Sequence, residues 1–535
     1  MSTGVVTRPR PSALHDTPRA QRALARFESA RVLGHPAFLT AVLLYAALWA
    51  YEAWGGGPRG RYPVLQDEDR YTQLPLLLLA AGALVATNLT TTRLHRSGTQ
   101  QLSGVLGLPP WRRTLAHLIT ALPPAALAAL LATARIAAYA ASPTAVGSPS
   151  PAELATGPAV VLLAGCAGVT LARFTSSAAA GPYAVLLLGV LVLCGALGVR
   201  GLKWAGPVGV EDEFAAPLPG DLMHRPVAEH LVYLAAVTGV LALLALVRAG
   251  MRAAPVRVAL VVLAGTAVVA GVLQYRPLPD DVVARRVDAE LHPGDRQRCR
   301  VADRVTFCAF PEFLARSRDW QRVTGGILAG APAAEGPYAV RQRIFLGAGH
   351  DGAGHDGTGR DGVAGMPPLE AWARDDDRHG TPGAVTVGTA WGTDDTGGDE
   401  MLAFAVRFAD RVVPGHDPSG GGMLCRARAV TVLWLAAQAT PQTADALRSI
   451  QRRSVNGVTL DTLGSSQALG FGAPEVQVVR DLLDLPAPQV ADRLKASWPA
   501  LADERTSTGR AARLLGVTAP PDAEQGAEDT RCDTD

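Results

Sequence analysis

Lysine is almost absent from this sequence. Only Lys203 and Lys495 occur among its 535 residues, and a leucine precedes each of them. A Walker A loop has the pattern GxxxxGK[ST], in which the lysine follows a glycine and contacts the terminal phosphates of ATP. The chain therefore carries no Walker A motif. HExxH, GxSxG and CxxC are absent as well, so no catalytic residues and no metal site are predicted from these motifs.

Charged residues are also scarce, at 18% of the chain against about 25% in a typical soluble domain. The net charge is only +2, so no basic surface is predicted and nucleic acid is not expected as a partner. The mean hydropathy is +0.16, and the apolar residues concentrate in 37–274, whereas 275–535 is polar. This division predicts a protein of the lipid bilayer with a large polar C-terminal part.

Seven apolar stretches approach the length of about 20 residues that a helix needs to cross a bilayer. They are 37–54, 74–91, 114–138, 157–174, 180–199, 229–248 and 257–274. Pro123 and Pro124 are expected to kink the third stretch, and Arg135 must lie near its outer end or face protein. The predicted fold class is an α-helical polytopic membrane protein of about seven spans, followed by an α+β extracytoplasmic domain over 275–516.

Arginines set the predicted orientation, because cytoplasmic loops carry an excess of basic residues. They concentrate in the leader 1–36 and in alternate loops, whereas the other loops carry most of the acidic residues. We therefore expect a multi-pass protein of the cell membrane with a cytoplasmic N-terminus. The first apolar stretch is interpreted as an anchor that is retained. Segment 18–34 is predicted to form an amphipathic helix on the inner membrane face, and a solvated basic leader is the alternative.

The polar part is predicted to be α+β with a helical second half, because apolar residues recur at helical spacing after residue 400. Cys299 and Cys308 flank a short strand-like segment and are predicted to form a disulfide, which suits an extracytoplasmic domain. The pairing of Cys425 and Cys532 stays open. Asp375–Asp377 is expected to be a solvated acidic turn, and the acidic tail 517–535 is expected to be disordered.

The segment 93–117, between the second and third apolar stretches, has a distinctive order of residues. A basic residue precedes Gly-Thr, followed by Gln-Leu, a Leu-Pro step and an arginine pair that opens the next span. Proline at this point predicts a short helix that ends where the chain turns. The order resembles the coupling segment of the permease subunits of type-2 ABC exporters. The matching positions are Arg96, Gly98, Thr99, Gln101, Leu102, Leu108, Pro109, Arg112 and Arg113.

The resemblance implies a six-span permease core over 37–256, with 257–274 as an added seventh span that places 275–516 outside. A separate ABC ATPase would bind the coupling segment and hydrolyse ATP, so the chain itself would be a transport subunit without enzymatic activity or cofactor. Two copies, or this chain and a sibling, would form a homodimer or a paired permease. Because arginine greatly outnumbers lysine, the composition is typical of a high-GC genome such as that of an actinobacterium.

Two features leave alternatives open. The family often has Glu where Gln101 stands and an acidic residue where Ser97 stands, and the segment also fits an ordinary positive-inside loop. The second hypothesis is therefore a seven-span membrane anchor or sensor, whose extracytoplasmic domain binds a ligand and needs no ATPase.

Overall fold

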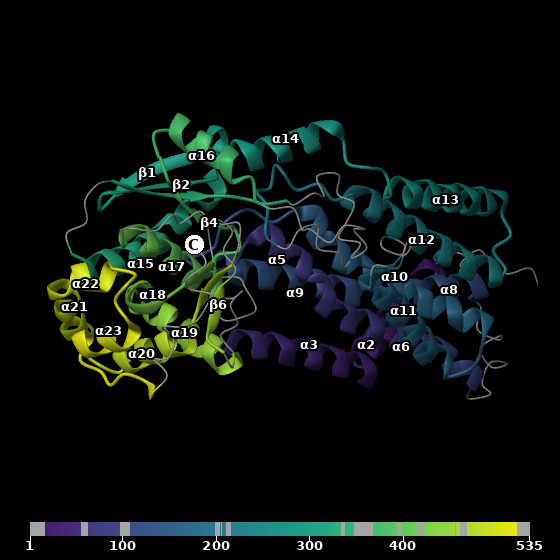
Figure 1. Ribbon diagram of the computed structural model, residues 1–535. Coiled ribbons are helices and arrows are strands. Elements are labelled where there is room, and N and C mark those ends of the chain that lie inside the picture. The colour runs from purple at the N-terminus through teal and green to yellow at the C-terminus, as the bar shows by residue number, and fades with distance from the viewer. Residues whose placement is uncertain are drawn as a thin grey trace, which may run out of the picture.

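A computed structural model gives the arrangement of the chain. It describes residues 17–54, 62–96, 108–197, 199, 204, 206–209, 216–332, 337–346, 367–392, 398–414, 422–454, 456–460 and 468–521. The described residues form a bundle of long helices at one end of the molecule and a mixed domain of short strands and helices at the other (Figure 1). We call the second part the C-terminal domain.

The bundle holds most of the predicted spans. Its helices are α2 (Thr17–Leu33), α3 (Pro36–Trp54), α5 (Leu65–Tyr71), α6 (Gln73–Arg96), α8 (Pro110–Ile119), α9 (Leu122–Ala140), α10 (Pro151–Phe174), α11 (Ala180–Ala196), α12 (Val227–Arg248) and α13 (Ala254–Leu273). In the described part of the chain, six helical segments are long and apolar enough to cross a membrane. The predicted span over 180–199 corresponds to α11, which is apolar but has only 17 residues.

Proline shapes the third span as the sequence predicts. Helix α8 ends at Ile119 and α9 begins at Leu122, with Pro123 and Pro124 in the first turn of α9. A proline lacks the backbone donor that a continuous helix needs, so the chain breaks there and restarts.

Small residues allow the two central helices to approach closely. A Cβ atom added at Gly168 of α10 would lie 2.3 Å from the carbonyl oxygen of Leu84 on α6. Across this contact the Asn88 side chain of α6 donates a hydrogen bond to the Gly168 carbonyl (3.2 Å). Glycine at such contacts is typical of helix packing in membranes, where close backbone approach supplies the packing energy.

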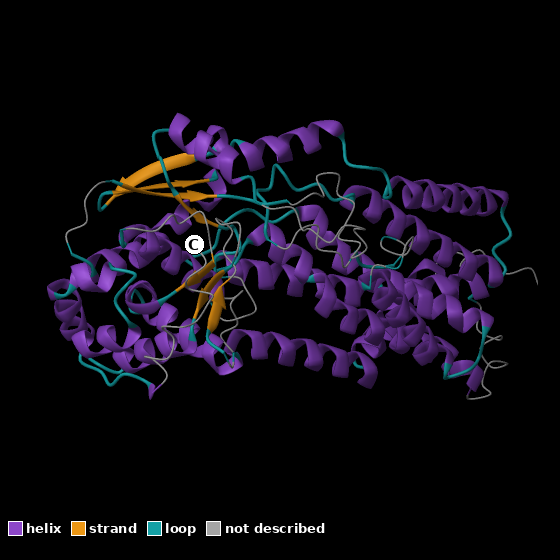
Figure 2. Ribbon diagram, in the orientation of Figure 1, coloured by secondary structure: helices purple, strands orange, loops and turns teal. Residues whose placement is uncertain are grey.

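The described residues of the C-terminal domain form two small sheets (Figure 2). Its strands are β1 (Arg298–Ala302), β2 (Val305–Ala309), β3 (Tyr338–Gln342), β4 (Val385–Val387), β5 (Gly422–Leu424), β6 (Val458–Leu460) and β7 (Leu469–Phe471). The first sheet has the order β1-β2-β3-β4 and the second has the order β5-β7-β6. Strand β1 pairs antiparallel with β2, and β2, β3 and β4 are parallel.

The predicted disulfide joins the first hairpin. Cys299 and Cys308 are opposite each other in the register of β1 and β2 and are bonded. The turn residues Asp303 and Arg304 both have positive φ, at 49° and 66°, which suits the right-handed twist of a two-residue hairpin. Cys425 is also disulfide-bonded, whereas Cys532 lies outside the described residues.

Helices make up the rest of the domain. They are α14 (Asp280–Leu291), α15 (Ser317–Gly330), α16 (Leu369–Arg378), α17 (Asp399–Val412), α18 (Arg426–Ala437), α19 (Pro441–Arg453), α20 (Ala473–Leu483), α21 (Ala487–Ala496), α22 (Trp498–Ala502) and α23 (Thr508–Leu515), with the 3₁₀ turns η1 (Pro293–Arg296) and η2 (Pro311–Arg316). Residues 427–437 of α18 are all buried, because α17, α19, α20, α22 and α23 pack around it. The predicted α+β domain with a helical second half is thus observed.

Two expectations about acidic and terminal segments need correction. Asp375 and Asp376 do not form a solvated turn, because they lie on α16 and are only 0% and 3% exposed. The segment predicted as a disordered tail begins with ordered chain, since Val517 and Ala519 pack against the domain core. Residues 522–535 lie outside the described part.

The core of the C-terminal domain also includes residues that precede 275, from the loops that connect the spans. Tyr62 and Val64 before α5, Val146 before α10, and Leu218 and Leu222 before α12 belong to the same buried cluster as the domain. Three loops on one side of the bundle therefore meet the C-terminal domain. We call this side the domain end of the bundle and the opposite side the loop end.

Candidate functional site at the two ends of the bundle

The predicted coupling segment connects α6 and α8 at the loop end. Gly98, Thr99, Gln101 and Leu102 lie outside the described residues. Arg96 is the last residue of α6, and Pro109 precedes Pro110, the first residue of α8. The structure therefore places both flanks of the segment at one end of the bundle.

The N-terminal helix α2 packs across these flanks. Its residues Ala25, Glu28 and Val32 are buried, and α2 contacts both α8 and α6. Glu28 lies 3.6 Å from the guanidinium of Arg93 on α6. Burial raises the pKa of Glu28, and the neighbouring Arg31 opposes this rise. The predicted helix over 18–34 is confirmed, and its buried face is held by the helices on either side of the coupling segment.

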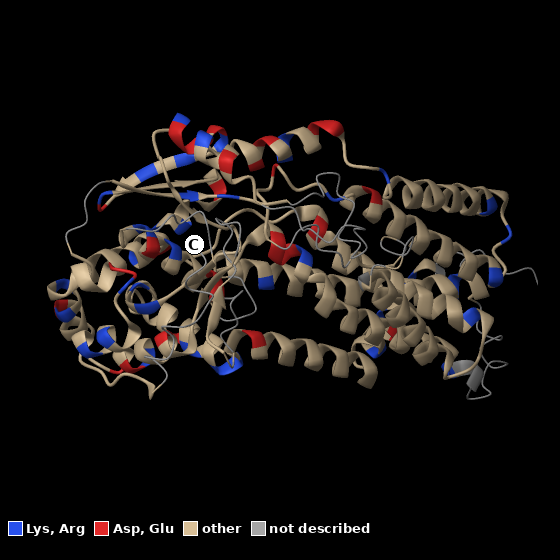
Figure 3. Ribbon diagram, in the orientation of Figure 1, with Lys and Arg blue, Asp and Glu red and all other residues tan. Residues whose placement is uncertain are grey.

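The arginine pair opens α8. The guanidinium of Arg112 lies 5.0 Å from the centre of the Trp111 ring, and Arg112 and Arg113 are both partly buried. Other arginines lie at the same end of the bundle, at or near the ends of its helices (Figure 3). They are Arg93, Arg173, Arg248, Arg252 and Arg257.

Ionisable and polar side chains from four helices and a loop form a layer at the domain end. Arg225, in the loop before α12, lies 3.1 Å from Glu153 of α10. Gln73 of α6 donates a hydrogen bond to the same carboxylate (2.5 Å). Arg135 of α9 is buried and lies 2.8 Å from Glu52 of α3, which confirms that this arginine faces protein near the end of its span. We call these five residues the polar layer.

The polar layer joins helices that are far apart in sequence. A buried ion pair strongly favours the arrangement in which both partners are present, because removal of one leaves an uncompensated charge. These contacts therefore hold α3 against α9, and α6 against α10, at the domain end of the bundle.

Arg316 and Glu312 are among the side chains that attach the C-terminal domain to the loops of the bundle. Arg316 is buried and donates hydrogen bonds to the carbonyl oxygens of Trp391 (2.5 Å) and Tyr62 (2.6 Å). Glu312 accepts hydrogen bonds from the side chain of Gln66 (3.1 Å) and the backbone of Gly220 (3.1 Å). Burial lowers the pKa of Arg316 to about 10, so the guanidinium stays charged at neutral pH.

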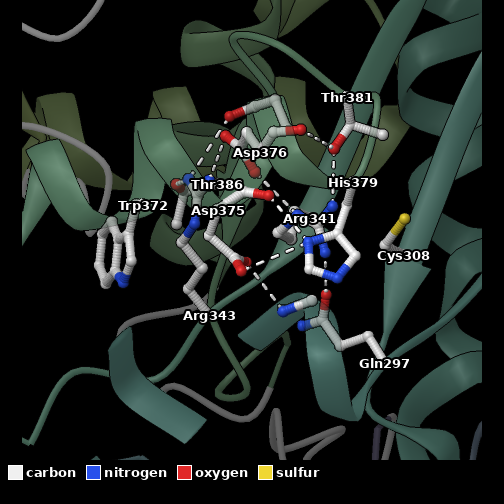
Figure 4. Close-up of polar contacts among 12 residues, drawn as sticks. Gln297, Cys308, Arg341, Arg343, Trp372, Asp375, Asp376, His379, Thr381 and Thr386 are labelled. Atoms are coloured by element: carbon white, nitrogen blue, oxygen red, sulfur yellow. Dashed lines mark hydrogen bonds and ion pairs between the residues drawn. The ribbon is translucent and has the colours of Figure 1, made fainter. Parts of the chain in front are cut away.

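A buried ionic cluster lies behind the hairpin of the C-terminal domain (Figure 4). Arg341 of β3 and Arg343 both contact Asp376 of α16, at 2.8 and 2.5 Å. Thr381 and Gln297 accept further hydrogen bonds from Arg341 (2.6 and 2.9 Å). Burial raises the pKa of Asp376, and the two guanidiniums oppose this rise. The cluster ties β3 and the residues that follow it to α16, because two buried guanidiniums share one carboxylate.

In the described part of the chain, no group of three or more His, Cys, Asp or Glu side chains could hold a metal ion. Trp320, Trp372, Trp391 and Trp434 are buried in the C-terminal domain, and Trp498 is half-buried against the same core.

Sequence reasoning missed Arg316, Glu312 and the acidic pair on α16. A signal for Arg316 existed, because it lies three residues after Phe313 and four before Trp320, on the face that an apolar pattern assigns to the core. The partner carbonyls of Tyr62 and Trp391 are 254 and 75 residues away along the chain, and no local pattern identifies them.

No family model, no curated protein and no solved structure matches this chain.

Proposed function

We propose that this chain is the membrane-spanning subunit of an ATP-driven ABC transporter, with its loop end in the cytoplasm and its C-terminal domain outside the cell membrane. A separate ATPase would bind the loop 93–113 and supply the energy of transport. The exporter direction rests on the resemblance of this segment to type-2 ABC exporter permeases. The single observation that supports the proposal most strongly is the packing of α2 across α8 and α6.

This packing would transmit a force on the coupling segment to the helices of the bundle. Helix α2 contacts α8 and α6, and the Glu28–Arg93 pair (3.6 Å) joins α2 to α6. A force on the segment between α6 and α8 would move three helices together instead of bending one loop. ATP-driven closure of two ATPase subunits would then tilt the spans between two packing arrangements, as in rigid-body alternating access. A pair of such chains, identical or not, would line the pathway.

The distribution of charge supports the orientation. Arginines outnumber acidic residues at the loop end, whereas at the domain end Arg135 and Arg225 are paired with Glu52 and Glu153. The positive-inside rule assigns the arginine-rich end to the cytoplasm. A disulfide in the C-terminal domain is consistent with an oxidising location outside the cytosol.

A second candidate is a membrane anchor or sensor that responds to a ligand of the C-terminal domain. The observation in its favour is the direct attachment of that domain to the span loops through Arg316 and Glu312. A change in the domain would reach the spans through these contacts without any ATPase.

Co-purification in mild detergent separates the two candidates. The full chain is compared with Leu102→Asp, which places a charge in the coupling segment, and with Ala253→Asp as the matched control. Ala253 is exposed between α12 and α13, at the same end of the bundle. Mass spectrometry then identifies the proteins that elute with each sample.

The transporter proposal predicts that an ATPase with a Walker A loop and an ABC signature elutes with the native chain and the control, and is lost with Leu102→Asp. Absence of such an ATPase from all three samples would refute the proposal and favour the sensor. Equal recovery with both variants would place the ATPase contact elsewhere and refute the role of the segment.

A further inference from the structure

An apolar cavity of about 350 Å³, open on one side, lies in the bundle between α6, α10, α11 and α12. Its walls include Leu77 and Leu84 of α6, Ala164 of α10, Val185 and Gly189 of α11, and Leu241 of α12. From Leu77 to Leu84 the cavity extends about 10 Å along α6, at 1.5 Å per residue. On α10 and α12 the lining residues 160–167 and 233–241 lie near the middle of each helix, so the cavity reaches from the domain-end half of α6 to the middle of the bundle.

The chemistry of the walls excludes water as a stable occupant. Aliphatic side chains and glycine or alanine form nearly all of the lining. A buried water needs two to four polar partners, and an apolar cavity of about 150 Å³ already stays dry and binds benzene. By that scale, a cavity more than twice as large accommodates a hydrocarbon of about a dozen carbon atoms.

Helix α11 covers one side of the cavity only in part. Ala184, Val185 and Leu188 pack against the neighbouring helices, whereas Leu186 and Leu187 are 64% and 70% exposed. No atom lies within 4 Å of the position that a Cβ of Gly189 would occupy. The other face of α11 is thus exposed at the depth of the bilayer hydrocarbon. Lipid chains are therefore the apolar material available to fill the cavity.

Among the described residues, polar groups lie at one end of the cavity. Pro207 lines the end nearer the polar layer, and its carbonyl oxygen lies 3.2 Å from Nε2 of His230. Trp204 packs edge-on against the His230 ring and lies beneath the guanidinium of Arg225. An amphiphile could therefore place its chain in the cavity and its polar end toward this group, in the orientation of a lipid in the leaflet at the domain end.

We propose that this cavity is a binding site for one acyl chain of a membrane phospholipid, entered from the bilayer beside α11. The site does not depend on the proposed ATPase, because it is formed by four helices of this chain alone. Occupancy would hold α11 away from α6 and α10, and an empty cavity would allow α11 to close onto them.

The test uses the full chain in lipid nanodiscs that contain a phospholipid with a photoreactive diazirine at mid-chain. After illumination, peptide mass spectrometry locates the adducts. Leu84 and Ala164 are 1% and 4% exposed, so lipid around the outside of the bundle cannot label them. Adducts at these two residues therefore report a chain inside the cavity, and adducts on α13 report surrounding lipid.

Gly189→Trp fills the cavity, and Gly265→Trp on α13 is the matched control, because a Cβ at either glycine meets no atom within 4 Å. The proposal predicts adducts at Leu84 and Ala164 in the native chain and in Gly265→Trp, and their loss in Gly189→Trp with α13 labelling unchanged. Gly189→Leu serves as a milder filling variant if the tryptophan variant does not elute as a single species. Absence of adducts at the two buried residues in the native chain, or equal labelling in the filled variants, would overturn the proposal.

Discussion

Replacement of Arg316 by methionine would remove the guanidinium that joins the C-terminal domain to the first loop of the bundle. Methionine keeps an unbranched apolar stem, so the packing of the buried part of the side chain is largely retained. The carbonyl oxygens of Trp391 and Tyr62, which accept hydrogen bonds of 2.5 and 2.6 Å, would lose their donor. Unsatisfied buried acceptors cost about 1–3 kcal/mol each, so we expect a loss of about 2–6 kcal/mol in the stability of the domain.

Two assays measure the effect of this substitution. Near-ultraviolet circular dichroism follows thermal unfolding through the buried tryptophans of the domain, and hydrogen exchange follows the loop. The amide of Leu65, which donates to the Val146 carbonyl (2.9 Å), should exchange faster in Arg316→Met. Arg448→Met is the control, because Arg448 is 43% exposed in its ion pair and surface changes usually stay within about 0.5 kcal/mol.

Equal unfolding temperatures for Arg316→Met and Arg448→Met would refute the role assigned to Arg316. A lower unfolding temperature without faster exchange at Leu65 would show that Arg316 stabilises the domain but does not hold the loop.

Three further substitutions test the packing of the chain. Asp376→Asn should destabilise the C-terminal domain by about 3–5 kcal/mol, because two buried guanidiniums lose their counter-charge, whereas thermal unfolding of Asp377→Asn, at an exposed neighbour, should stay near that of the native chain. Removal of the disulfide by Cys308→Ser should cost about 2.5 kcal/mol for a separation of nine residues, measured against the native chain without reductant; an unchanged unfolding temperature would contradict this estimate. Gly168→Val should separate α6 from α10 and lower the thermal stability of the bundle in detergent, whereas the same substitution at Gly265 should have little effect.

The sequence predicted the features that depend on local composition. Apolar runs of about 20 residues located the spans, because the hydrocarbon thickness imposes that length. Pro123 and Pro124 predicted the break between α8 and α9, and the flanking cysteines predicted the disulfide. Each of these features follows from residues that are neighbours in the chain.

The missed features depend on contacts between distant segments. Asp375–Asp377 has the local sequence of a solvated turn. The desolvation cost of burying Asp376 is offset by its ion pairs with Arg341 and Arg343, which come from the adjoining sheet region. Glu312 has the composition of a surface acid, yet its partners come from two loops of the bundle. No periodicity or motif in the local sequence encodes these pairings.

Helix α6 connects the two ends of the bundle. At the loop end Arg93 contacts Glu28 of α2, and at the domain end Gln73 contacts Glu153 of the polar layer. The chain before α6 forms α5, where Gln66 donates a hydrogen bond to Glu312 of the C-terminal domain. A displacement of the segment after Arg96 would therefore reach the C-terminal domain through α6, α5 and the hydrogen bond between Gln66 and Glu312. This path gives the proposed transport cycle a direct mechanical route to the domain, and it gives the sensor hypothesis the same route in the opposite direction. The effect of Leu102→Asp on ATPase recovery distinguishes the two directions, because the sensor requires no partner at the loop end that hydrolyses ATP.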